Sequence, residues 1–384
     1  MILFRLKKKN TLNRTVNIMF DIINKPLGYV LSFLADIFSN DFAVAVAVFT
    51  LLINVVLIPL SIKSQKSAVS QMRIKPKLDE LKKKYGDDRQ KMAMAQQELY
   101  KQEGVSMSGG CLPMIIRLVL MMSIYSLIMS PLTYMSNVGS KEMNNVYTTV
   151  QKLNPEAEEK YEGTTQELYD MVIADLGWKS NNTNRELALV NNINGSGKTF
   201  KEVLVDKDYK DEKLDKLAAD VYEKIKSDVD KITQKYQKKP INFNLLGSEK
   251  LDMTKTPEFE WNVFEAFQLL WIIPIGAFLA QIVTGLISMR VNKINNPDAP
   301  SMKFMILGMP LISLFIGFGL PGGVGFYWIC SSLIGGLIQS GVQLWYGPHK
   351  MLARERAKEL NKQCDFETKQ IEKFSKDSES IIKD

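Results

Sequence analysis

The sequence is poor in the residues that carry most enzymatic and metal chemistry. It contains one histidine, His349, and three cysteines, and no cysteine lies between residues 137 and 260. So few residues exclude a catalytic triad built on histidine and a histidine-based zinc site, and three scattered cysteines give no disulfide framework. We therefore expect a protein that is not an enzyme and that uses no metal or cofactor.

Charged residues are almost missing from several long segments. Near-continuous apolar character extends over residues 42–62, 111–135, 264–289, 304–320 and 322–346, the last two separated by the sequence Leu320-Pro321-Gly322-Gly323. An apolar helix of about 20 residues spans the hydrocarbon core of a bilayer. The sequence therefore predicts an all-α integral membrane protein with five transmembrane helices.

The charges that connect these spans predict their orientation. The connection 63–110 holds eleven basic and six acidic residues, whereas 137–260 holds nineteen basic and twenty-three acidic ones. Because basic segments near spans stay in the cytoplasm, we expect 63–110, the loop 290–303 and the tail 347–384 to be cytoplasmic. The insert 136–263 is then extracytoplasmic.

The connecting segments carry helical patterns of their own. Residues 63–110 read as a cytoplasmic helical hairpin that turns at Gly86-Asp87-Asp88, with an aspartate as N-cap of the second helix. Its apolar side is thin and rich in methionine, so we expect a mobile element. The N-terminal segment 1–41 is interrupted by charges and proline, which favours an amphipathic helix lying in the outer membrane interface.

The insert has its clearest periodicity at 211–238. Apolar residues recur there at helical spacing, at Leu214, Leu217, Val221, Ile225, Val229, Ile232 and Tyr236. A one-sided stripe needs a partner, which we expect to be a helix near 156–174 or the membrane surface. The insert is thus predicted to be an α-helical interaction module.

Polar groups within the spans are the candidate functional residues. Arg117 lies about 9 Å into its span and Asn54 about 12 Å, both measured from the cytoplasmic side at 1.5 Å per residue. The further candidates are Thr50, Gln281, Thr284, Ser288, Ser332 and Gln339. Isolated Ser, Thr and Gln side chains in spans also bond neighbouring helices, and an arginine also snorkels to the headgroups. A shared, hydrated cavity open to the cytoplasm is the interpretation that accounts for all of them together.

Two stretches of the chain resemble a known family. The run KSQKSAVSQMRIKPKLDELKKKYGDDRQKMAMAQQELYKQEGVSMSGGCLPMIIR resembles the cytoplasmic hairpin and following helix of the YidC family of membrane protein insertases. LWIIPIGAFLAQ and LPGGVGFYWICSSLIGGLIQ are similar to the family's third and last core spans. The resemblance covers residues 41–135 and 262–346. It implies five core helices around a hydrophilic groove that is closed to the outside and open to cytoplasm and lipid.

The chain departs from the family pattern at the groove. The family usually carries its groove arginine five residues before the proline that is here Pro59, and that position is Asn54. It usually has glutamine where this chain has Arg117, and asparagine where this chain has Ser332. The cation and the amide are thus exchanged between two helices. An insert of this size between the second and third core spans is also unusual for the family.

The resemblance implies insertion of new membrane proteins, alone or beside the Sec translocon, in a bacterial cell membrane. The expected partners are nascent membrane protein clients, the ribosome and the lipid bilayer, and the sequence holds no specific nucleic-acid motif. A transporter or channel that binds an anionic solute through Arg117 is the alternative, although the sequence lacks the internal repeats that many transporters show. A protein that only scaffolds other membrane proteins is a third interpretation.

Overall fold

The computed structural model describes most of the chain and divides it into two compact units. The described residues are 21–86, 88–104, 112–136, 138, 140–157, 160–163, 165–178, 184–195, 197–209, 211–257, 259, 268–295 and 303–383. Unit 1 holds residues 1–52, 118–279 and 309–331, and unit 2 holds 53–117, 280–308 and 332–384. We describe the two units separately.

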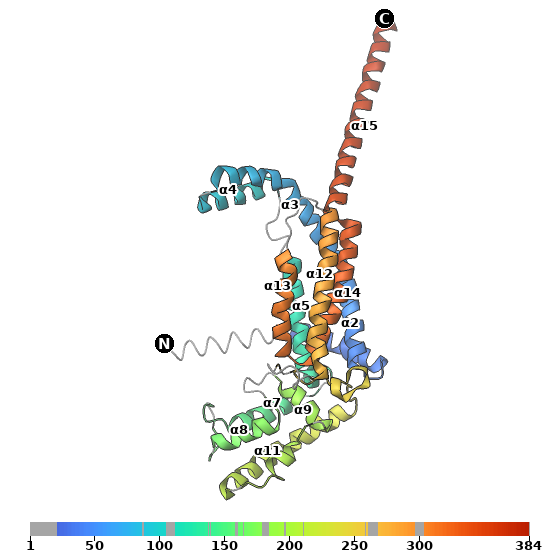
Figure 1. Ribbon diagram of the computed structural model, residues 1–384. Coiled ribbons are helices and arrows are strands. Elements are labelled where there is room, and N and C mark those ends of the chain that lie inside the picture. Colours follow the sequence, from blue (N-terminus) through green and yellow to red (C-terminus); the bar gives the residue numbers. More distant parts are fainter. Residues whose placement is uncertain are drawn as a thin grey trace. The chain divides into compact units, whose positions relative to one another are not determined.

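The described residues are helical, with two isolated β-bridges and no strand. Five helices contribute residues to both units, namely α2 (Phe42–Val56), α5 (Leu112–Met129), α12 (Ile272–Asn295), α13 (Lys303–Phe318) and α14 (Gly322–Tyr346). Unit 1 also contains α6 (Pro131–Tyr134), α7 (Ser140–Gln151), α8 (Gln166–Asp175), α9 (Arg185–Ile193), α10 (Phe200–Leu204), α11 (Glu212–Gln237), η1 (Leu245–Gly247), η2 (Glu249–Leu251) and η3 (Leu269–Trp271). Unit 2 also contains α3 (Ile58–Tyr85), α4 (Arg89–Gln102) and α15 (Pro348–Lys383). The predicted all-α class is confirmed for these residues (Figure 1).

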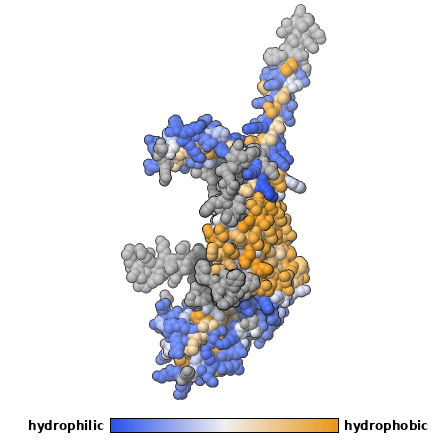
Figure 2. All heavy atoms as spheres, viewed as in Figure 1, coloured by the Kyte–Doolittle hydropathy of each residue, from blue (hydrophilic) through white to orange (hydrophobic). Residues whose placement is uncertain are grey.

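The apolar helices only partly meet the length of a membrane span. Within the described residues, Leu269–Lys293 is long and apolar enough to cross a bilayer by itself. Leu118–Met129 and Gly308–Phe318 are apolar but shorter, and α14 carries serine, glutamine and glycine, which lower its mean hydropathy. Apolar residues nevertheless gather on the visible faces of α12 and α13, while hydrophilic ones cover α4 (Figure 2). The number of five spans therefore stays a prediction.

The first predicted span is two helices, because the chain bends within it. The axes of Phe42–Val56 and Ile58–Ser70 differ by 46°. Pro59 stands in the first turn of α3; proline has no N–H and its ring would clash with the carbonyl of Val55, so α2 ends before it. The first hairpin helix consequently begins at Ile58, six residues before the predicted Ser64.

The break predicted at Leu320-Pro321-Gly322-Gly323 is confirmed, and it joins the last span to the end of the insert. Gly322 donates its backbone N–H to the carbonyl of Lys255 at 2.8 Å, and Gly323 donates to Met253 at 2.7 Å. A Cβ on Gly322 would lie 3.2 Å from the Met253 Cα. Glycine therefore permits the approach that satisfies the first N–H groups of α14.

The core of the insert is α11 packed against α7 (Figure 1). The predicted stripe is confirmed, since Leu214, Val221, Ile225, Ile232 and Tyr236 are buried. The main partners of α11 are α7 and α10 rather than α8, the helix within 156–174, which contacts α10. The helix α7 was not predicted because its sequence, SKEMNNVYTTVQ, is rich in Asn and Thr, which are weak helix formers.

The N-terminal helix packs on α6, the short helix that follows α5. It extends over residues 21–37 and buries Leu31 while exposing Ile22, Tyr29 and Phe33. Its Asp21 accepts a hydrogen bond from the Tyr134 hydroxyl at 2.7 Å, and a Cβ on Gly28 would lie 2.5 Å from the Tyr134 carbonyl oxygen. An exposed apolar face of this kind suits the predicted interfacial position, which stays a prediction.

In unit 2, α3 and α4 form the predicted hairpin, and α3 also packs against α15. Asp88 caps α4 as predicted, accepting a hydrogen bond from the backbone N–H of Lys91 at 3.1 Å. Arg73 and Glu355 form an ion pair at 2.5 Å that joins α3 to α15, and Ile74 beside it is buried. The first hairpin helix is therefore held by α15, which was predicted only as a tail. In α4, none of residues 90–102 is buried.

Candidate functional site

The structure places nearly all of the predicted groove positions in unit 2. These are Asn54 on α2, Gln281, Thr284 and Ser288 on α12, and Ser332 and Gln339 on α14. All six side chains are half-buried. Unit 2 also contains the hairpin and α15, so the polar ends of the apolar helices share a compact unit with the segments predicted to be cytoplasmic.

Two consecutive glycines on α14 let two other helices approach it closely. A Cβ on Gly335 would lie 3.0 Å from Oδ1 of Asn54, and a Cβ on Gly336 would lie 2.8 Å from both Cβ and Cγ2 of Thr284. Small residues at such positions allow close packing of helices within membranes. Asn54 of α2 and Thr284 of α12 therefore each approach the α14 backbone at one of these two glycines.

The two threonine hydroxyls among the candidates are used locally. Thr284 donates to the carbonyl of Ala280 at 2.8 Å and presents its carbon atoms to Gly336. Thr50 is buried in unit 1 and donates to the Val46 carbonyl at 2.7 Å. Both hydroxyls are thus bonded to carbonyls of their own helices. Asn54, Gln281 and Gln339 also have interaction partners, but amides offer more donors and acceptors than one partner uses.

Arg117 is described only as part of the helix α5. Its backbone belongs to unit 2, and its side chain lies outside the described residues. The predicted exchange of cation and amide with Asn54 therefore stays a prediction. Arg117 is the sixth residue of α5. Its described neighbours Ile115 and Leu118 are exposed and apolar.

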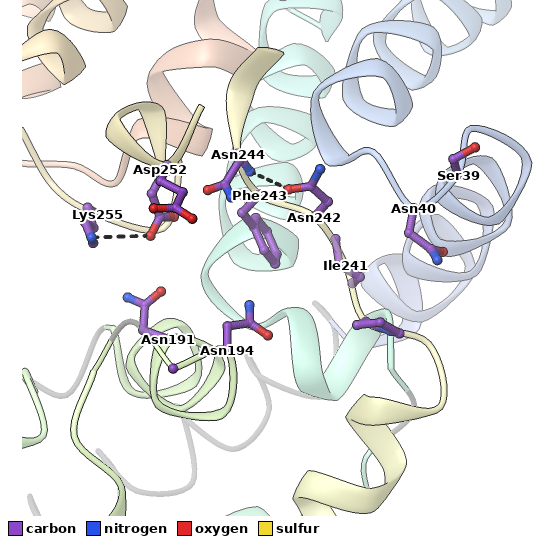
Figure 3. Close-up of a pocket in the computed structure, with 13 residues that line it drawn as sticks. Ser39, Asn40, Asn191, Asn194, Ile241, Asn242, Phe243, Asn244, Asp252 and Lys255 are labelled. Carbon is purple, nitrogen blue, oxygen red and sulfur yellow. Dashed lines mark hydrogen bonds and ion pairs between the residues drawn. The ribbon is translucent and has the colours of Figure 1, made fainter. Parts of the chain in front are cut away.

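A polar cavity of about 600 Å³ lies in unit 1, and the sequence analysis did not predict it. It is lined by three separate segments, residues 39–40, 191–195 and 240–255. Asn191 and Asn194 reach towards it from α9 (Figure 3). A clustering of asparagines at 191–194 and 242–244 was the available sequence signal.

The groups that line this cavity bind one another. The Thr254 hydroxyl lies 2.5 Å from Oδ1 of Asn191 and 2.6 Å from Oδ1 of Asp252, and Asp252 pairs with Lys255 at 3.8 Å. Asn242 accepts a hydrogen bond from the backbone N–H of Asn244 at 3.0 Å (Figure 3). The backbone N–H of Asn242 also donates to the Asn40 carbonyl at 2.8 Å, so hydrogen bonds connect the three segments around the cavity.

Comparison with known proteins finds a family match in the part of the chain that contains α2 to α7. A family model described as 60Kd inner membrane protein matches residues 33–156. Among similar proteins, the "Membrane protein insertase YidC" of Alkalihalophilus pseudofirmus is 40% identical over 111 residues, which cover 27% of this chain and 44% of that one. The protein of the same name from Dinoroseobacter shibae is 40% identical over 109 residues, covering 28% and 18%.

Each of these relatives matches only part of the chain. A third relative with the same name, from Geobacter sulfurreducens, is 33% identical over 121 residues, which cover 31% of this chain and 23% of the relative. The chain therefore spans less than half the length of these relatives. The segment that the family model matches contains the hairpin and the first two predicted spans, which carry the strongest motifs of the resemblance, and in this part the chain is similar to membrane protein insertases of the YidC type.

Proposed function

We propose that the protein is a membrane protein insertase that receives hydrophobic clients in a polar groove open to the cytoplasm. The observation that supports this best is the family match over the hairpin and the first two predicted spans. It is joined by the gathering of Asn54, Gln281, Ser288 and Gln339 in the same unit as the hairpin.

The groove lowers the cost of moving a polar tail across the hydrocarbon layer. A polar or charged group leaving water for an apolar medium loses several kcal/mol unless it finds a partner. Amides at half depth supply donors and acceptors, and Arg117 supplies a positive charge for an acidic tail. The apolar part of the client passes along the open side of the groove into lipid, where the exposed faces of α12 and α13 already suit hydrocarbon.

The segments around the groove fit the other proposed partners. The hairpin as a whole has more basic than acidic residues, and α15 begins with Lys350, Arg354 and Arg356, which favours the cytoplasmic face and contact with a ribosome that delivers the client. The hairpin precedes α5 and α15 follows α14, whereas the insert follows α5 and contacts the first residues of α14, so we propose that the insert lies outside. Cooperation with the Sec translocon extends the same mechanism to clients with larger external parts.

Reconstitution of the purified protein into lipid vesicles tests this function. A single-span client with a short acidic tail is expected to move its tail into the lumen, where added protease does not reach it, only in vesicles that contain the protein. Empty vesicles of the same lipids are the control. Uptake of a small anion by the protein-containing vesicles, with the client tail still digested, would instead support the transporter interpretation.

A further inference from the structure

The short helix α6 joins the predicted second span to the insert, and one carboxylate holds it. Glu186 on α9 accepts a hydrogen bond from the backbone N–H of Thr133 at 2.9 Å, through Oε2. Its Oε1 lies 2.6 Å from the Thr133 hydroxyl. The helices α6 and α9 pack against each other, so these bonds connect the insert to the end of the chain's second apolar helix.

This carboxylate is buried, and among the described residues no cation pairs with it. Burial is the main cause that raises the pKa of Glu186 from its ordinary 4.5 to about 7, and the hydrogen bonds from Thr133 and Leu132 offset it only in part. Its neighbour Arg185 turns away, with its guanidinium 4.7 Å from the centre of the Tyr147 ring, because adjacent residues on a helix do not face each other. A buried carboxylate without a charged partner is a strained arrangement when ionised.

Protonated Glu186 fits the same geometry without the cost of burying a charge. A neutral Glu186 donates its O–H to the Thr133 hydroxyl oxygen and still accepts the Thr133 N–H with its other oxygen, because a hydroxyl both donates and accepts. We propose that Glu186 is a positioning residue whose protonation holds the insert on α6, and whose ionisation at rising pH loosens that attachment. This inference does not depend on the insertase activity.

The other titratable groups around this contact do not change charge near neutral pH. Tyr147 on α7 has a pKa raised well above its ordinary value, chiefly by burial, and the Tyr134 hydroxyl on α6 donates to Asp21 of the N-terminal helix. Burial lowers the pKa of Arg185 from its ordinary 12.5, but arginine starts so far above neutral pH that it stays protonated. The insert contains no histidine. Among the described residues around this contact, Glu186 is therefore the group that titrates between pH 6 and 8.

The sign of the effect follows from the raised pKa. The closed state binds a proton more tightly than the opened state, in which Glu186 is solvated, so closure is favoured at low pH and loses stability as pH rises through about 7. With a solvated pKa near 4.5, the opening equilibrium is expected to rise roughly tenfold between pH 6 and pH 8.

Hydrogen exchange of the full-length protein in lipid nanodiscs tests the proposal. Protection factors, which correct for the intrinsic pH dependence of exchange, are expected to fall roughly tenfold from pH 6 to pH 8 for amides of α6 and α9. Glu186→Gln keeps the shape and has no proton to lose, so its protection factors are expected to change less than about twofold. The control Glu202→Gln alters an exposed cap of α10 and should retain the wild-type fall.

A second variant keeps the proposal testable if Glu186→Gln fails to fold. Thr133→Val removes a hydrogen bond that lowers the pKa of Glu186, so the fall is expected to shift to higher pH. A wild-type protein without the fall, an undiminished fall in Glu186→Gln, or an unshifted fall in Thr133→Val would overturn the proposal. An equal fall at the amides of α11 would show general loosening of the insert and would overturn it as well.

Discussion

Arg117→Ala is expected to lower the insertion of a client with an acidic tail by at least roughly tenfold in reconstituted vesicles. A tenfold change corresponds to about 1.4 kcal/mol in the barrier. Two opposite charges about 4 Å apart near a protein surface interact by about 4 kcal/mol before desolvation is counted, so the loss of one such contact supports an effect of this size. A client with a neutral tail should be affected far less, because the cation then has nothing to meet.

The matched control moves the cation rather than removing it. The double variant Asn54→Arg with Arg117→Gln returns both residues to the positions usual in the family and is expected to restore most of the activity. Asn54 lies against Gly335 in unit 2. An arginine at position 54 would therefore stand in the same unit as the polar residues Gln281, Ser288 and Gln339. Full activity of Arg117→Ala on clients with acidic tails would contradict the exchange of cation and amide.

Removing the end of the hairpin is expected to abolish insertion. The variant replaces residues 79–102 by a short flexible linker and retains Val69, Arg73 and Ile74, the part of α3 that is buried or paired with α15. The deleted part includes all of α4, in which none of residues 90–102 is buried. Its loss should therefore spare folding while it removes the surface that receives the client. Insertion is measured by protection of the client tail in vesicles.

The contact between α3 and α15 provides the comparison. Arg73→Ala breaks the ion pair with Glu355, in which both side chains are about half exposed. Such surface pairs contribute at most about 1 kcal/mol, so this variant should keep most of its insertion activity. If the deletion of residues 79–102 inserts clients normally while the apolar helices stay assembled, the hairpin is only a connector.

Local signals predicted local structure well. Proline and glycine end α13 and begin α14, Asp88 caps α4, and a period near 3.6 identifies the buried side of α11, because each depends on neighbours within a few residues in the chain. The bend at Leu57 was missed for a different reason. The proline that causes it was visible, but an apolar run of span length was taken as one helix.

Long-range contacts left no comparable signal. Glu186 is one of many acidic residues in the insert, and only the fold shows that it is buried against Thr133. The pairing of Arg73 with Glu355 joins residues 282 positions apart. The charge pattern of the tail also did not predict that it forms a 36-residue helix packed on the hairpin. Among the candidate groove residues, Thr50 and Thr284 looked like the others in sequence, yet their hydroxyls bond their own helices.

The central claim is that the polar residues of unit 2, namely Asn54, Gln281, Ser288 and Gln339, receive the client. Site-specific crosslinking tests this claim most directly. A photoreactive amino acid is placed at Asn54 or, in a separate variant, at Val56, two residues further along α2 and 73% exposed. A client stalled on the ribosome carries its acidic tail into the membrane containing either variant. The account predicts a strong adduct between the tail and position 54, with mainly lipid adducts at position 56. Equal yields of the tail adduct at both positions, or none at position 54, would contradict it.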